Sequence, residues 1–157
     1  MNKFVLICVA ALCGATFIAS SRAEEAAAPG FDAALAQKTG ADEHGMRNYV
    51  LVILKAGPTP LPKGDKRTEV FKGHFANMER LASAGKLAVA GPFAGGDDGW
   101  RGMFIFAVKD IEEAKALTAT DPVIISGEMV AEYHKLFSSA ALMLVNETHK
   151  KIAKQNF

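Results

Sequence analysis

The chain has 157 residues, of which 50% are hydrophobic and 22% are charged. This length and composition indicate one globular domain and exclude a disordered chain. The formal net charge of +1 implies no strongly basic surface, so nucleic acid is excluded as a favoured partner. A net charge this close to zero does not select a class of small ligand.

The first 23 residues have the plan of a secretory signal peptide. Lys3 gives a short basic start, an apolar run follows from Phe4 to Ala19, and Ser21-Arg22-Ala23 places small residues where a signal peptidase cleaves. The alternative is an uncleaved membrane anchor, but the run is shorter than the roughly 20 residues that a bilayer span needs. We therefore predict cleavage after Ala23, a periplasmic or secreted mature protein, and no stable membrane insertion.

Both cysteines, Cys8 and Cys13, lie within this signal peptide. A lipoprotein signal needs a small residue before its cysteine, whereas here Ile7 and Leu12 occupy those positions. The mature chain would contain no cysteine, which excludes a disulfide, a thiol nucleophile and a thiolate metal site. An exported domain of this kind must be held together by its core alone.

An N-terminal extension is predicted over residues 24–47. It consists of a low-complexity spacer, a short helix over 31–39 that Gly40 ends, and a polar loop. The first strand is predicted at 48–54, where the sequence NYVLVIL is apolar on both faces. The proline- and glycine-rich stretch 55–66 is typical of a loop.

The clearest helix is predicted over residues 67–84, and Gly85 supplies its end. At about 100° per residue, one face of this helix carries an apolar stripe that includes a histidine. The stripe comprises Val70, Phe71, His74, Phe75, Met78, Leu81 and Ala82. Two further strands are predicted at 86–91 and 100–108, with a glycine-rich hairpin turn at 95–99 between them.

A second helix is predicted over residues 111–119, because Asp110 and Glu113 have the spacing of a capping box. Asp121-Pro122 is expected to end this region, since the residue before a proline avoids the helical conformation. A fourth strand is predicted at 129–137. A final helix, capped by Ser138 or Ser139, is expected to continue to about residue 154.

The order strand–helix–strand–strand–helix–strand is the split βαβ, or ferredoxin-like, plan of an α+β protein, here with an extra C-terminal helix. Helices on one face of a four-stranded sheet leave the other face to be buried. Because the predicted strands are apolar on both sides, we expect a second subunit to cover that face and form a homodimer.

His74 is the most informative single residue, because it lies in an apolar stripe where leucine would pack without cost. A buried imidazole must find hydrogen-bond partners or incur a penalty of about 1–3 kcal/mol. Two interpretations stay open at this point. His74 is either a satisfied core residue or an acid–base group.

Asp121 is the second candidate. An aspartate before a proline commonly ends a helix and forms an Asx-turn. As a functional residue, its carboxylate would accept the proton of one imidazole nitrogen of His74 and leave the other nitrogen free as base or acid. Gly91-Pro92-Phe93 would let a ligand approach the backbone, although a strand end explains the same residues.

No phosphate loop, paired zinc-ligand spacing or Gly-x-Ser-x-Gly motif occurs in the sequence. The remaining histidines, His44, His134 and His149, are dispersed along the chain. We therefore predict neither a metal site nor a cofactor, and we expect the partner to be a small molecule.

Three stretches together resemble the YCII-related (YciI-like) family: GHFANMERLASAGKLAVAGPF at 73–93, the strand GMFIF, and IEEAKALTATDPVIISG at 111–127. The resemblance covers residues 49–137. It implies a dimeric α/β barrel, in which two ferredoxin-like subunits pack their sheets together. It also implies a His–Asp pair, which maps onto His74 and Asp121 and would be catalytic. Arg67 fits the basic residue that such sequences often place one or two helix turns before the histidine. We therefore predict that Arg67 and the segment Gly91-Pro92-Phe93 bind the substrate.

The chain departs from the commonest family pattern by its export signal, by the extension at 24–47, and by a terminal helix at 139–157 that follows a family domain at 48–138. The first functional hypothesis is an isomerase or lyase that uses the His–Asp pair on a small cyclic or aromatic molecule, although a shared fold does not by itself transfer a reaction. Two alternatives stay open: a non-catalytic, small-molecule-binding periplasmic dimer, and a purely structural pair inside the core.

Overall fold

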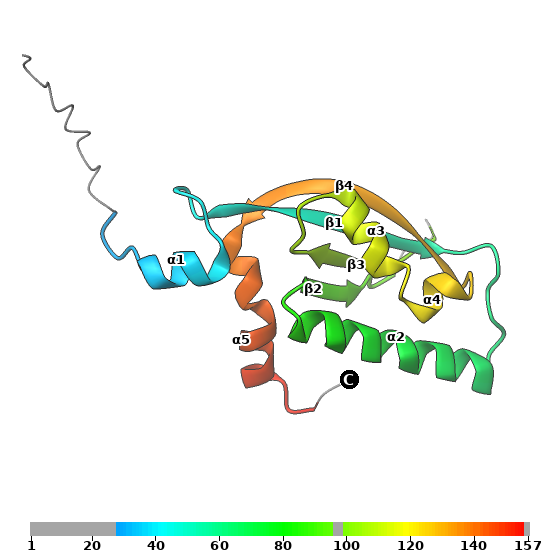
Figure 1. Cartoon of the computed structure of the whole chain (residues 1–157). Helices are drawn as coiled ribbons and strands as arrows, with labels where there is room; N and C mark the ends of the chain where they lie inside the picture. Colours follow the sequence, from blue (N-terminus) through cyan, green and yellow to red (C-terminus); the bar gives the residue numbers. More distant parts are fainter. Residues whose placement is uncertain (1–27, 96–98, 156–157) are drawn as a thin grey trace, which may run out of the picture. The chain divides into compact units, whose positions relative to one another are not determined.

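A computed structural model describes residues 28–95 and 99–155 (Figure 1). The predicted signal peptide at 1–23 lies outside the described residues and stays a prediction. The chain divides into a unit that ends at Phe31 and a unit that begins at Asp32, and the second contains every helix and strand given below. No helix in the described ranges is long and apolar enough to cross a membrane.

The strands form one antiparallel sheet in the order β2-β3-β1-β4. Their bounds are β1 Met46–Ala56, β2 Leu87–Pro92, β3 Trp100–Phe106 and β4 Met129–Ser139. With a helix between β1 and β2 and helices between β3 and β4, the chain follows the βαββαβ order (Figure 1). The predicted ferredoxin-like α+β fold is therefore confirmed.

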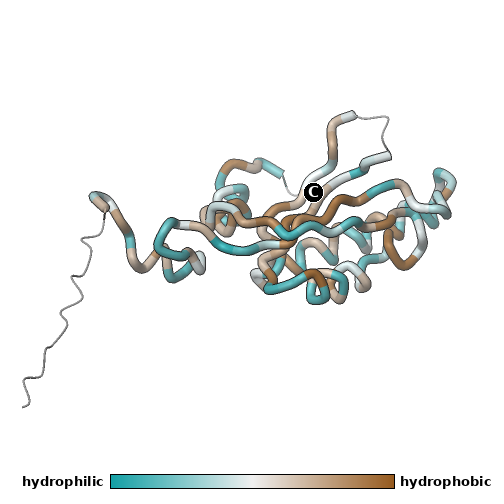
Figure 2. The backbone as a smooth tube through the Cα atoms, turned by 90° about the horizontal axis from the view of Figure 1, so that it is seen from above, coloured by the Kyte–Doolittle hydropathy of each residue, from teal (hydrophilic) through white to brown (hydrophobic). Residues whose placement is uncertain are grey.

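The helices that pack on the sheet are α2 (Asp65–Ser83), α3 (Ile111–Thr118) and the short α4 (Pro122–Ile125). Before the sheet lies α1 (Ala33–Thr39), and after it lie a 3-10 helix η1 (Ala140–Leu144) and α5 (Val145–Ile152). Figure 2 shows hydrophobic residues concentrated along the strands, whereas hydrophobic and hydrophilic residues alternate along the helices. In α2 and α3 this alternation places one face toward the sheet and one toward solvent.

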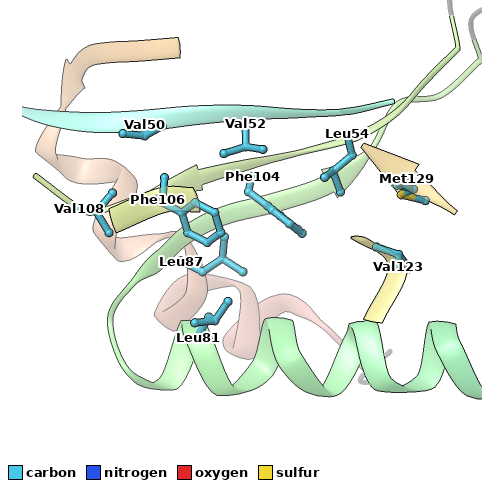
Figure 3. Close-up of a cluster of buried hydrophobic side chains, with 11 residues drawn as sticks. Val50, Val52, Leu54, Leu81, Leu87, Phe104, Phe106, Val108, Val123 and Met129 are labelled. Atoms are coloured by element: carbon cyan, nitrogen blue, oxygen red, sulfur yellow. The ribbon is translucent and has the colours of Figure 1, made fainter. Parts of the chain in front are cut away.

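The main core lies between the sheet and α2, α3 and α4. Alternation along β1 points Val50, Val52 and Leu54 toward the helices, and Phe104 and Phe106 point the same way from β3 (Figure 3). Leu81 of α2, Ala114 of α3 and Val123 of α4 complete this layer with Leu87, Val108 and Met129. Each large side chain buried here contributes about 1.5–3 kcal/mol, so the sheet fixes where α2 and α4 lie.

The opposite face of the sheet carries a smaller buried cluster, which comprises Tyr49, Ala88, Ile105 and Ala107. Leu142 and Met143 of η1 pack against it. The C-terminal segment therefore differs from the single helix predicted at 139–157. Ser139 caps it as predicted, with its hydroxyl oxygen accepting the N–H of Ala141 at 3.2 Å, but a 3-10 turn comes first and brings its apolar residues back to the sheet.

Candidate active site

Helix α2 places His74 on its buried face. The helix begins at Asp65, ends before Gly85, and carries Phe71, His74 and Leu81 on the side that faces the sheet. The His74 residue is only 7% exposed. An imidazole in this position needs a polar partner from another element.

Asp121 supplies that partner from the start of α4. Its carboxylate caps the helix by accepting the N–H of Val123 at 3.2 Å, and Pro122 occupies the first helical position, where a missing N–H costs nothing. The predicted Asx-turn is confirmed. The four-residue helix that it starts was not predicted.

The two side chains form a symmetric contact. Nδ1 of His74 lies 2.9 Å from Oδ1 and 2.9 Å from Oδ2 of Asp121, which is 0% exposed. Since a carboxylate can only accept, the proton between them sits on Nδ1, and the neutral ring keeps its lone pair on Nε2. No hydrogen bond reaches Nε2 from the residues that the structure describes.

Three phenylalanine rings surround the imidazole. The ring centroids of Phe71, Phe75 and Phe104 lie 6.0, 5.5 and 5.9 Å from that of His74. Phe75 is 46% exposed, so this wall of the site borders solvent. The apolar surroundings lower the local dielectric and strengthen the interaction between imidazole and carboxylate.

A glycine allows the two elements of the pair to approach. A Cβ atom on Gly73 would lie 2.9 Å from Cγ of Pro122, closer than real Cβ contacts allow. The absence of a side chain at position 73 therefore lets α2 lie directly against the first residue of α4. This contact brings Asp121 within hydrogen-bond distance of His74.

Arg67 lies two turns before His74 on α2, and its charge is already paired. Its Nε and Nη2 donate to Oε1 of Glu128 at 3.1 and 3.0 Å, and its guanidinium lies over the ring of Phe71, 4.4 Å from the centroid. Arg67 therefore supports the phenylalanine wall of the site. Its predicted role in binding substrate stays a prediction.

Glu128, 9% exposed, was not among the predicted residues. Its other carboxylate oxygen accepts the N–H of Leu61, while Gly57 donates to the Glu128 carbonyl at 2.8 Å and Thr59 donates to the Gly127 carbonyl at 3.1 Å. The prolines between these donors have no N–H to satisfy. Hydrogen bonds therefore hold the predicted loop before α2 against the residues that precede β4.

The predicted segment Gly91-Pro92-Phe93 ends β2 and does not gather around the histidine. Pro92 pairs with Gly102 and Gly91 with Met103, so Gly91 falls on the sheet face away from the helices. Phe93 packs against Trp100, with ring centroids 5.3 Å apart. Within the described residues, no hydrogen bond or ring contact joins this segment to the His–Asp pair.

The fold and the site define an α+β protein of ferredoxin-like topology with a buried His–Asp pair between α2 and the start of α4. The model of the YCII-related domain matches residues 48–134, more than half of the chain. The chain belongs to the YCII-related domain family.

No curated protein matches the chain. Among solved structures, the chain is similar to 5-chloro-2-hydroxyhydroquinone dehydrochlorinase from Burkholderia phenoliruptrix in complex with 2,5-dihydroxybenzoquinone. The two chains share 22% identity with a TM-score of 0.42, over 55% of this chain and 90% of the other. This likeness is too distant to carry residue roles from one chain to the other.

Proposed function

We propose that the protein is an acid–base enzyme of the isomerase or lyase type, in which His74 moves a proton on a small cyclic or aromatic molecule. The observation that carries this proposal is the placement of Nδ1 at 2.9 Å from both oxygens of a fully buried carboxylate. This arrangement fixes the tautomer and the orientation of the ring, as general-base catalysis requires.

The chemistry follows from the fixed tautomer. Nε2 takes a proton from a carbon of the substrate, and the imidazolium that forms is stabilised by the Asp121 carboxylate. In an isomerisation, Nε2 returns the proton to a different carbon. In an elimination, the electron pair of the broken C–H bond forms a double bond as a leaving group departs with its own electron pair. Both reactions need one base that is held still.

The surroundings of the imidazole support a flat, largely apolar substrate. Around the imidazole lie the rings of Phe71, Phe75 and Phe104. Their faces and edges stack favourably on another ring and provide no hydrogen-bond partner for a charged substrate group. Phe75 reaches solvent, so it is the wall that an entering ring would meet first. Arg67 forms an ion pair with Glu128, so it adds no uncompensated charge to the site, which keeps its preference for an apolar substrate.

Proton transfer at carbon provides the test. In D2O, the protein incubated with a metabolite extract is expected to convert a cyclic or aromatic component or to exchange one of its C–H protons, as NMR and mass spectrometry would detect. The His74→Gln variant is expected to lose this activity by about 10²–10⁴-fold. A ligand that binds the wild-type protein and returns unaltered, without deuterium, would instead favour the non-catalytic binding protein.

We further propose that a second copy of the chain covers the sheet face away from α2. Leu51 and Met103 are only half-buried on that face, next to buried Ile53 and Ile105. Light scattering is expected to give twice the monomer mass for the wild type. Met103→Lys should give a monomer, because burying an unpaired charge is costly. Glu79→Lys, on the exposed side of α2, should stay dimeric, and a monomeric wild type would contradict the proposal.

A further inference from the structure

Asn77 lies one turn after His74 on α2 and has no part in the proton transfer described above. It is only 8% exposed, so its amide must be satisfied within the protein. Its Oδ1 lies 2.7 Å from Nη2 of Arg80 and 3.2 Å from Oγ1 of Thr120. Thr120 directly precedes Asp121, the carboxylate of the pair.

Counting the protons available on Asn77, Arg80 and Thr120 shows which residue donates the hydrogen bond between α2 and the turn before α4. The Thr120 hydroxyl has one proton, and its shorter contact is with the carbonyl oxygen of Leu117 at 2.7 Å. Nη2 of Arg80 carries two protons, and it reaches both Oδ1 of Asn77 at 2.7 Å and Oγ1 of Thr120 at 3.1 Å. Arg80 therefore joins α2 to the turn before α4, and Asn77 holds the guanidinium in place for that purpose.

The hydrogen bond from Arg80 to Thr120 connects the turn before α4 to α2. The hydrogen bonds within the turn make no such connection. The Asp121 N–H donates to the Thr118 carbonyl at 2.9 Å, and the carboxylate accepts from Val123, both within the same segment. Those bonds set the shape of the turn. The contacts that set its distance from His74 include Gly73 against Pro122 and the link from Arg80.

We propose that Asn77 and Arg80 are positioning residues for the His–Asp pair: they fix Thr120, and through it the Asp121 carboxylate, against the imidazole. The inference rests on the proposed function, because it assigns to these residues the geometry on which proton transfer by His74 depends. It identifies two residues on the same helix as His74 that neither the sequence pattern nor the mechanism had singled out.

The test follows the proton on Nδ1 of His74 by NMR of the histidine-labelled protein. In the wild type, this proton is expected to be hydrogen-bonded and slow to exchange with water. Asn77→Leu keeps the approximate size of the side chain and does not weaken the helix, but it lacks the acceptor. It should speed the exchange about tenfold, the equivalent of one lost hydrogen bond. Asn77→Asp, which still accepts from Arg80, should restore slow exchange.

A second variant and a control separate positioning from general stability. Arg80→Gln removes the bridging donor at an exposed site, so it tests the same link if Asn77→Leu fails to fold. Lys72→Gln removes a cation from an exposed position of the same helix and should leave the exchange rate unchanged. A wild type without a protected Nδ1 proton would contradict the proposed function itself. A protected proton that both variants leave at the wild-type rate, even with a lower Tm, would overturn only this inference.

Discussion

The Asp121→Asn variant is expected to fold normally and to lose proton-transfer activity by about 10²–10⁴-fold. Asparagine caps a helix as well as aspartate does, so the N–H of Val123 keeps its acceptor and α4 keeps its start. The amide nitrogen, however, is a donor. Because Oδ1 must still accept the N–H of Val123, this nitrogen takes the place of Oδ2 beside Nδ1 of His74. It favours the tautomer with the ring proton on Nε2, which has no lone pair for the substrate proton.

Two measurements check this result. The nitrogen chemical shifts of the imidazole should report the change of tautomer, and the deuterium-exchange assay should report the loss of activity. Asp110→Asn is the matched control, because Asp110 caps α3 in the same way, accepting the N–H of Glu113 at 2.8 Å. That variant should keep full activity. If Asp121→Asn keeps it too, the carboxylate does not set the tautomer, and a structural role for the pair becomes the better account.

Local signals predicted most of the fold, because caps, turns and apolar periodicity act within a few residues. Asp110 caps α3 as its spacing to Glu113 predicts. Gly40 ends α1 at a φ of 68°, the left-handed conformation that favours glycine. The apolar stripe of α2 was placed correctly for the same reason, except for Phe75, which is 46% exposed.

The lengths of the first and last strands of the chain could not be predicted in this way. β1 and β4 each span eleven residues and extend beyond the predicted 48–54 and 129–137. They pair continuously from Met46 opposite Ser139 to Ala56 opposite Met129. These end residues form strands because the neighbouring strand satisfies their backbone groups, and no apolar pattern at their own positions reveals it.

The candidate site depends still more on tertiary structure. His74 and Asp121 lie 47 residues apart. Each was singled out by its chemical type, and their pairing was one hypothesis among others until the family resemblance favoured it. Glu128 gave no local signal, because its partners Arg67 and Leu61 lie 61 and 67 residues earlier. Arg67 was singled out as a substrate-binding residue, which stays a prediction, and its ion pair with Glu128 was not predicted, because it depends on how the start of α2 meets the start of β4.

Gly73→Ala is expected to destabilise the protein, although alanine in place of glycine inside an open helix stabilises it by about 0.5–1 kcal/mol. The new Cβ would lie 2.9 Å from Cγ and 3.5 Å from Cβ of Pro122. A proline ring cannot rotate away, so α2 and α4 must separate. Overpacking of this kind costs about 1–3 kcal/mol, which leaves a net loss of up to about 2.5 kcal/mol in the free energy of unfolding.

The same separation should lower activity more than stability, because it pulls the Asp121 carboxylate away from Nδ1 of His74. A displacement on the order of 1 Å at a reacting group costs about 10²-fold in rate. Pro122→Ala removes Cγ, so the double variant Gly73→Ala, Pro122→Ala should recover both the free energy of unfolding, measured by urea denaturation, and the exchange activity. Such a recovery would show that Gly73→Ala acts through the contact between α2 and α4. If Gly73→Ala alone stabilised the protein as in an open helix, that contact would not determine the geometry of the pair.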